Sequence, residues 1–159
     1  MSITIEKVSY AKPKDARILE VVLTEWFKDP KDLNLTSPNM SYPFKFKKWV
    51  SMTYANQDIQ SFVIKSDDWI VGIGNVMILP DFKRAHALHI FIDKPYRRQG
   101  FAKKIMEFLE TLAKEEKMET MSLRVMPKNE PAIKLYEKLG FELNGLTKDG
   151  DLMMEKELV

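Results

Sequence analysis

The segment HIFIDKPYRRQGFAKK, residues 89–104, shows how this chain is organised. An apolar strand-like run, Ile90 to Ile92, leads into a short basic turn that ends at Gly100, and a helix begins at once. The first backbone N–H groups of a helix lack partners and carry partial positive charge, so phosphate groups bind there. Taken alone, the pattern fits either such a phosphate cradle or a solvated basic turn before an ordinary helix.

Upstream of this segment, the sequence predicts an antiparallel meander. Its strands are short apolar runs joined by tight turns, at Ser61–Lys65, Trp69–Leu79 and Ala85–Asp93. Residues 29–44 hold three prolines and no sustained period, so we expect a loop there, followed by a short helix at residues 45–55.

The N-terminal part is expected to hold one strand and one helix. Met1–Val8 alternates between apolar and polar residues as a strand does. A helix should open at residues 12–15 and end at residues 29–30. Its apolar stripe is Ile18, Leu19, Val22 and Trp26.

Downstream, a long helix over residues 100–117 precedes an alternating strand at Thr120–Met126, with Met121, Leu123 and Val125 on one face. Asn129 should cap a further helix that Gly140 closes. Two strands, Phe141–Asn144 and Asp151–Leu158, complete the chain. This order predicts a mixed α/β fold of three layers. A twisted, mostly antiparallel sheet is flanked by helices on both faces, in a single domain over residues 1–159.

Composition excludes several classes of site. The 159 residues include no cysteine and two histidines, which rules out disulfides, thiolate metal sites and a three-histidine metal site. We therefore expect no metal. The net charge of +2 gives no case for a broad nucleic-acid surface. Because no apolar run could span a bilayer and the first residues do not form a signal peptide, we expect a cytoplasmic protein without membrane contact.

Two motifs together resemble the GNAT superfamily of N-acetyltransferases. The first is Arg97-x-x-Gly100-x-Ala102 after an Ile-Phe-Ile-Asp strand, where the family often has Gly at the position of Ala102. The second is NEPAIKLYEKLGFE, residues 129–142, which matches Asn-x-x-Ala-x-x-x-Tyr-x-x-x-Gly-Phe. The resemblance is good over residues 84–145 and extends across the chain at lower specificity. It implies a fold of the GNAT type and acetyl-CoA as cosubstrate.

The resemblance also implies a set of cosubstrate contacts. The pyrophosphate would be held by backbone N–H groups of Arg98, Gln99, Gly100, Phe101, Ala102 and Lys103, with positive charge from Arg97 and Arg98. The backbone of Ile90, Phe91 and Ile92 would pair with the pantetheine amides like an added strand. Asn129 would contact the pantetheine arm, and Ala132 and Tyr136 lie on the same helix face as Asn129.

The chemistry needs an acid for the leaving thiolate and a base for the amine. Family members use a tyrosine at the position of Tyr136 as general acid, although an aromatic at helical spacing can also be a simple core residue. The strand before the turn lacks the glutamate that many members use as base, so His86 and His89 are the candidates, with His86 ranked first. Three residues apart, they should point to opposite faces unless a bulge intervenes, and both could instead be structural. Without cysteine, direct transfer in a ternary complex is expected.

The resemblance implies that the acceptor is an amine of a small molecule or a protein. It also implies an acceptor pocket within residues 26–54, because the first helices and their loop shape this pocket in the family. The aromatic residues of that segment are more readily explained as core, and its lysines as a solvated helix face. These residues are Trp26, Phe27, Tyr42, Phe44, Phe46, Trp49 and Tyr54, with Lys45, Lys47 and Lys48. A homodimer stays open; Met153 and Met154 could serve an interface, but core packing is favoured. The alternatives are an acyl-CoA-binding module without turnover and a transferase for longer acyl groups.

Overall fold

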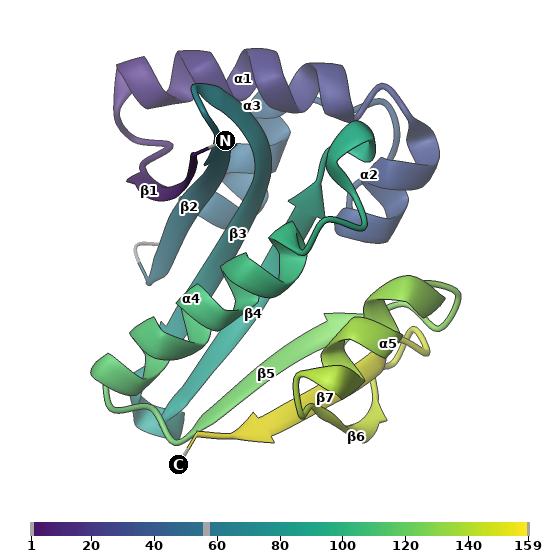
Figure 1. The fold of residues 1–159 in the computed structure, drawn as a ribbon. Helices are drawn as coiled ribbons and strands as arrows, with labels where there is room; N and C mark the ends of the chain where they lie inside the picture. The colour runs from purple at the N-terminus through teal and green to yellow at the C-terminus, as the bar shows by residue number, and fades with distance from the viewer. Residues whose placement is uncertain (1, 56–57, 159) are drawn as a thin grey trace.

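One seven-stranded sheet runs through the part of the chain that the computed structural model describes, residues 2–55 and 58–158 (Figure 1). Its strand order is β1-β2-β3-β4-β5-β7-β6, and all neighbours are antiparallel except β4 and β5. The strands are β1 (Ile3–Val8), β2 (Ile59–Ser66), β3 (Trp69–Leu79), β4 (Arg84–Ile92), β5 (Thr120–Val125), β6 (Glu142–Leu146) and β7 (Leu152–Glu157). The predicted mixed, mostly antiparallel sheet is confirmed.

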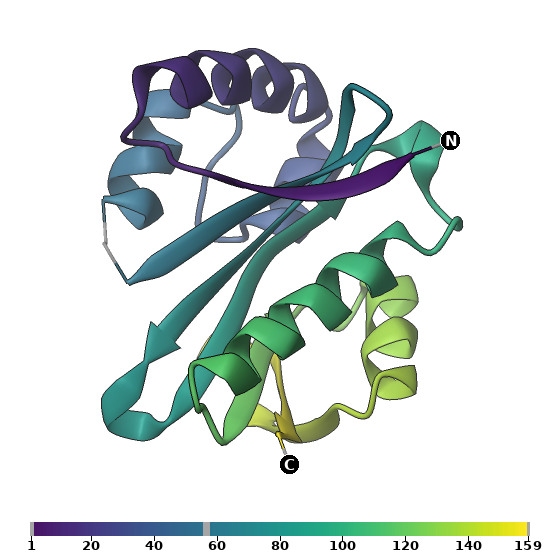
Figure 2. The ribbon, with the colours of Figure 1, turned by 60° about the vertical axis from the view of Figure 1, so that its left-hand side comes forward.

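Helices cover both faces of this sheet, as expected. Figure 2 shows the N-terminal helices on one side and the later helices on the other. The helices are α1 (Pro13–Trp26), α2 (Pro30–Thr36), α3 (Phe46–Trp49), α4 (Phe101–Glu115) and α5 (Glu130–Lys138). A π-helical turn, η1 (Val50–Tyr54), continues α3, and short 3₁₀ turns follow β3 (η2, Pro80–Phe82) and β4 (η3, Lys94–Tyr96). Among the described residues, no helix is long and apolar enough to cross a membrane.

The helix α2 corrects the expectation of a loop over residues 29–44. Asp29, which the sequence suggested only as a helix end, caps a new helix by accepting a hydrogen bond from the backbone N–H of Lys31. Pro30 occupies the first helical position, where its missing N–H costs nothing. Leu33 is buried and anchors the helix against the core. Pro30 therefore opens a helix here.

The stripe expected on α1 is partly wrong. Leu19, Leu23 and Trp26 are the buried residues, at the i, i+4, i+7 spacing of one helix face. Ile18 is 46% exposed, because it precedes Leu19 by one residue and is therefore rotated by about 100° around the helix. The buried face of α1 packs with α2 and α3 in an aromatic core that includes Phe27 and Trp49.

The helix α4 packs on the opposite face of the sheet. It buries Phe101, Ile105, Met106, Leu109 and Ala113, while Phe108 and Leu112 are only partly buried. Gly74 on β3 allows this close approach, since a Cβ atom there would lie 2.6 Å from Cδ1 of Ile105. Beside α4, the expected inward face of β5 is confirmed, because Met121, Leu123 and Val125 are buried. Met154 of β7 is core as well, as favoured from the sequence.

Candidate active site

The strands β4 and β5 pair over a short distance and then separate (Figure 1). Their parallel register runs from Arg84 opposite Thr120 to His86 opposite Ser122, and no later β4–β5 pair forms among the described residues. Residues 87–92 of β4 therefore have no strand partner on the side that faces β5. Such an unpaired backbone edge can bind an extended amide-containing ligand.

A bulge in β4 lies where the two strands separate. His89 and Ile90 together oppose Gly74, because Ile73 pairs with Phe91 whereas Asn75 pairs with Leu88. His89 has a φ of 48°, in the left-handed region. The side chain of Asn75 is buried, and its Nδ2 donates to the carbonyl oxygens of Leu88 at 3.3 Å and His89 at 3.2 Å. Asn75 thus supplies hydrogen bonds that the interrupted ladder lacks.

The bulge also decides where the two histidines lie. Ala85, Ala87 and Ile90 contact the core under α4, so the extra residue changes the alternation of faces after Ala87. His86 and His89 therefore share the other face of the sheet. The sequence left this outcome conditional on a bulge, and the bulge is present.

The start of α4 presents a row of unpaired donors. The helix begins at Phe101 after Gly100, whose φ of 83° is the left-handed conformation that glycine adopts without strain. The first helical hydrogen bond is from the N–H of Lys104 to the carbonyl of Gly100. The backbone N–H groups from Arg98 to Lys103 have no acceptor among the described residues. No atom lies within 4 Å of a Cβ placed on Gly100, so a ligand can approach this backbone.

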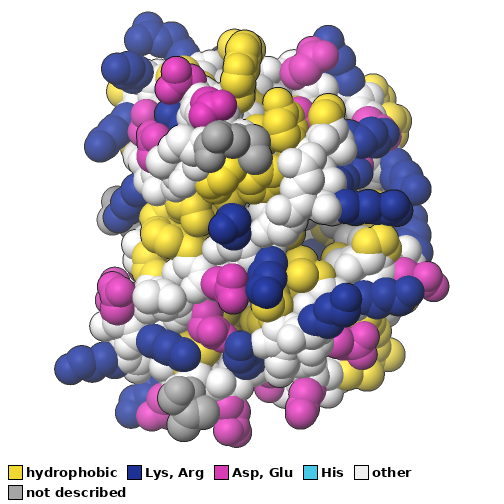
Figure 3. All heavy atoms as spheres, in the orientation of Figure 1, with side chains coloured by type: hydrophobic (Ala, Val, Ile, Leu, Met, Phe, Trp, Pro, Cys, Tyr) yellow, Lys and Arg dark blue, Asp and Glu magenta, His cyan; other side chains and the backbone are white. Residues whose placement is uncertain are grey.

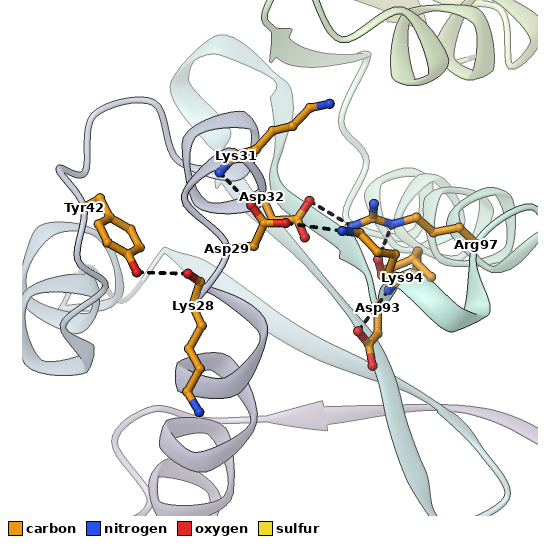
Figure 4. Close-up of polar contacts among 9 residues, drawn as sticks. Lys28, Asp29, Lys31, Asp32, Tyr42, Asp93, Lys94 and Arg97 are labelled. Atoms are coloured by element: carbon orange, nitrogen blue, oxygen red, sulfur yellow. Dashed lines mark hydrogen bonds and ion pairs between the residues drawn. The ribbon is translucent and has the colours of Figure 1, made fainter.

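The basic side chains of this turn differ in their surroundings. Arg98 and Lys103 are exposed and form no ion pair with the described residues. Arg97 instead extends toward α2, where its Nη2 lies 3.2 Å from a carboxylate oxygen of Asp32 (Figure 4). Figure 3 shows basic side chains near the starts of α4 and α5, interspersed with acidic ones. The positive charge at this turn therefore comes from a few side chains, such as Arg98 and Lys103, and not from a broad basic surface.

The helix α5 carries the second motif. Asn129 occupies the N-cap position, but its side chain makes no capping hydrogen bond, so its amide is available to a ligand. Tyr136 is buried, with its ring against Phe141 at a centroid distance of 6.0 Å. Its hydroxyl makes no hydrogen bond with the described residues, and burial raises the pKa of Tyr136 to about 12. The phenol is therefore protonated at neutral pH.

His86 contacts a polar side chain of the neighbouring strand β5. Its Nδ1 lies 2.8 Å from the hydroxyl oxygen of Ser122, a fully buried residue. Burial first, and then the charges of Arg124 and Arg84, lower the pKa of His86 to about 4. Each arginine has its own carboxylate: Arg84 lies 2.7 Å from Glu155 and Arg124 lies 3.5 Å from Asp151. His86 is therefore neutral at physiological pH.

His89 is enclosed by aromatic rings. Its Nδ1 lies 2.6 Å from the hydroxyl of Tyr54, and its ring stacks on Trp49 at 4.1 Å. Burial, with a smaller contribution from Arg124, lowers its pKa to about 3. Trp49 in turn donates through Nε1 to the hydroxyl of Tyr10. These contacts fit a structural role for His89 better than a role as base.

The aromatic residues of the acceptor segment are core, as favoured from the sequence. Trp26, Phe27 and Trp49 are buried, and Phe44, Phe46 and Tyr54 pack around them. Tyr42 is the exception at 52% exposed, with its hydroxyl donating to the carbonyl of Lys28. The three lysines at 45, 47 and 48 are exposed.

The described residues also enclose two hollows. One of about 600 Å³ is bounded by Thr120 of β5, Gly140, β6 and β7. The other, of about 390 Å³, lies between the end of α1, α2 and the loop after β4, and includes Trp26, Asp32 and Lys94. Neither contains Tyr136, His86 or the donors of the basic turn. The candidate site is therefore defined by its hydrogen-bonding groups and by the edge of β4 that β5 leaves unpaired.

Comparison with known proteins points to one family. A family model described as "Acetyltransferase (GNAT) family" matches residues 21–141. The chain is 29% identical over 102 residues to an N-alpha-acetyltransferase of Saccharolobus solfataricus, an alignment that covers 60% of each protein. It is 40% identical over 70 residues to a probable spermine N(1)-acetyltransferase of Bacillus subtilis subsp. natto, covering 43% of this chain and 46% of that protein. The chain thus spans less than two thirds of either relative.

A solved structure shows the same fold over nearly the whole chain. The spermidine N-acetyltransferase from Vibrio cholerae, in complex with CoA and spermine, superposes with a TM-score of 0.78. The match covers 98% of this chain and 95% of that one, at 15% sequence identity. At this identity the likeness establishes the fold alone.

Proposed function

The chain belongs to the GNAT acetyltransferase family and is an acyl-transferring enzyme, and from this premise we propose that it moves the acetyl group of acetyl-CoA onto a primary amine. The transfer occurs by direct attack in a ternary complex within one domain over residues 1–159. The observation that carries this proposal is the row of backbone N–H groups from Arg98 to Lys103, which have no protein acceptor among the described residues. Donors in such a row at a helix start match a diphosphate.

The surrounding residues fit the rest of the cosubstrate. Arg98 and Lys103 are free of ion pairs with the described residues and can neutralise phosphate charge. The pantetheine arm lies along Ile90 to Ile92, on the edge of β4 that β5 leaves unpaired. The side-chain amide of Asn129, which makes no capping hydrogen bond, faces the same arm. The small side chain of Ala132 leaves room for the pantetheine arm.

The reaction requires two proton transfers around one nucleophilic attack. The neutral amine nitrogen attacks the thioester carbonyl carbon, and backbone N–H groups stabilise the oxyanion. When the tetrahedral intermediate collapses, the C–S bond breaks and the thiolate takes a proton from the hydroxyl of Tyr136. A raised pKa of about 12 keeps this hydroxyl protonated until the thiolate forms.

His86 is the proposed base, either directly or through a water molecule. An alkyl amine has a pKa of about 10.4 and must lose a proton before it attacks. His86 is neutral, and if its Nδ1–H donates to Ser122, its Nε2 carries a free lone pair. A pKa of about 4 makes His86 a weak base, so it does not keep the proton of the amine but passes it through a water molecule to the solvent.

The test is an acceptor screen that detects the free thiol of CoA. Polyamines, amino acids, aminoglycosides and peptides with free N-termini form the panel, since the relatives' names include both spermine and N-alpha acceptors. We expect acceptor-dependent thiol release with at least one amine, and binding of CoA by calorimetry. Absence of CoA binding would overturn the proposal. Ping-pong kinetics would contradict direct transfer in a ternary complex.

One observation favours an alternative, a module that binds acyl-CoA without efficient turnover. Both histidines on β4 have lowered pKa values, and β4 carries no carboxylate that could replace them as a base. Tight CoA binding with no thiol release across the whole panel would establish this alternative. Competition by succinyl-CoA or longer acyl-CoA would instead indicate a different acyl donor.

A further inference from the structure

Arg97 occupies the first position of the phosphate-binding motif, but its side chain is engaged elsewhere. Its Nε donates to the carbonyl of Ile92 at 2.8 Å, and its Nη2 lies 3.2 Å from Oδ1 of Asp32 (Figure 4). Its guanidinium also lies over the ring of Phe91, 5.2 Å from the centroid. Three separate interactions thus hold the group on the side of α2.

These contacts join the proposed CoA-binding turn and the end of β4 to α2. Asp32 belongs to α2, in the segment expected to shape the acceptor pocket, and its side chain is only 11% exposed. Phe91 lies on the strand proposed to hold pantetheine, and its ring contacts Trp26 at 5.1 Å and Phe27 at 5.0 Å. Arg97 therefore connects the end of β4, the phosphate turn and α2 through one planar group.

We propose that Arg97 is a positioning residue that couples the acceptor-side helix α2 to the CoA-binding turn through Asp32, and that it does not bind phosphate through its guanidinium. The inference rests on the proposed function. Because such a coupling is reciprocal, CoA that orders the turn also stabilises α2, and a disturbed α2 weakens CoA binding.

The substitution Asp32→Asn distinguishes the two roles of Arg97 by the sign of its effect. If Arg97 serves phosphate, removing a nearby negative charge frees the guanidinium and strengthens the binding of the polyanion CoA. If Arg97 couples the two elements, the same change weakens CoA binding, by roughly fivefold or more. Isothermal calorimetry with CoA measures this directly. Binding equal to or tighter than wild type would overturn the inference.

Arg97→Lys provides a second test that keeps the positive charge. Lysine is a point charge and cannot contact Ile92, Asp32 and the ring of Phe91 together. We expect it to weaken CoA binding about as much as Asp32→Asn does, and the double variant to be no worse than either single one. Wild-type affinity in Arg97→Lys would contradict the coupling.

Hydrogen exchange gives a readout that needs no acceptor. In wild type, saturating CoA should slow exchange in residues 29–37 as well as at the start of α4. In Asp32→Asn, saturating CoA should still protect α4 but leave α2 unprotected, even where thermal unfolding is unchanged. Equal protection of α2 in both proteins would overturn the inference.

Lys94→Ala is the matched control. Lys94 reaches α2 from the same loop, 3.3 Å from Asp29, but its side chain is 67% exposed and the pair is weak. CoA affinity should stay within about twofold of wild type at physiological salt. A loss as large as that of Asp32→Asn would show that any contact between loop and helix suffices, and would overturn the assignment to Arg97. If wild type itself does not bind CoA, the proposed function fails and this inference with it.

Discussion

The Nδ1 atom of His86 lies 2.8 Å from the hydroxyl of Ser122, in the last residue pair that joins β4 to β5. Beyond this pair the strands separate, so the imidazole is fixed at the point where the proposed thioester site opens. The tautomer with hydrogen on Nδ1 leaves Nε2 as the acceptor. Ser122 therefore orients the proposed base from a neighbouring strand.

Ser122→Ala should lower kcat by about tenfold, a typical share of general base catalysis. The affinity for CoA should stay within about twofold, because Ser122 lies outside the proposed phosphate and pantetheine contacts. Ser61→Ala on β2 is the control, since it also removes a buried strand hydroxyl but far from β5. Equal kcat values for Ser122→Ala and wild type would show that the hydrogen bond between Ser122 and His86 does not contribute to catalysis.

Tyr136→Phe should reduce kcat by at least about tenfold while CoA binding remains nearly intact. Because the hydroxyl makes no hydrogen bond with the described residues, its removal leaves no partner unsatisfied and should not lower the melting temperature. This separates a role in proton transfer from one in packing. Steady-state kinetics and thermal denaturation on the same preparation check both parts, and an unchanged kcat would exclude the tyrosine as the acid.

Acid should destabilise this protein in part through its histidines. The pKa of His89 is about 3 in the folded chain and about 6.5 when unfolded, so below pH 6.5 the unfolded state binds more protons. The free energy of unfolding therefore falls as pH decreases from about 6.5 toward 3, with a limiting slope of about 1.4 kcal/mol per pH unit for this group. Denaturant unfolding between pH 6.5 and 4.5 measures the slope. His89→Phe, which keeps an aromatic ring against Trp49, should show a smaller slope, and an equal one would contradict the assignment.

Periodicity and turn residues predicted most of the fold. The boundaries of β3 are those expected from the sequence, and β2, β4, β5, α1 and α5 differ by two residues or fewer at most ends, because their apolar patterns are strong. The helix α2 was missed, since its seven residues are too few to establish a period and the signal of Asp29-Pro30 was read only as a stop.

The site was predictable only where it is local in sequence. The donors before α4 and the N-cap position of Asn129 follow from short motifs, although the Asn129 side chain makes no capping hydrogen bond. Ser122 and Asp32 instead act on His86 and Arg97 through pairings between distant segments. Asn75 is the only amide side chain in the apolar run VGIGNVMIL, and this pattern indicates a side chain that forms hydrogen bonds inside the sheet. The lowered pKa values could not be predicted, because burial depends on tertiary packing.

Gly100→Ala tests the phosphate turn against a matched glycine. Gly100 and Gly150 have φ angles of 83° and 85°, and neither has an atom within 4 Å of a Cβ placed on it. Alanine should therefore cost about 1 kcal/mol of stability at either position, from left-handed strain alone. Only at Gly100 would the added methyl group lie beside the row of backbone donors.

Calorimetry with CoA should consequently show a loss of about tenfold or more for Gly100→Ala and none for Gly150→Ala, although both variants melt at similarly lowered temperatures. The equal strain removes global destabilisation as an explanation for any difference in affinity. If both variants bind CoA like wild type, the diphosphate does not lie on the N–H groups from Arg98 to Lys103. If both lose affinity equally, the loss reflects the backbone strain that they share, and the start of α4 has no special part in binding.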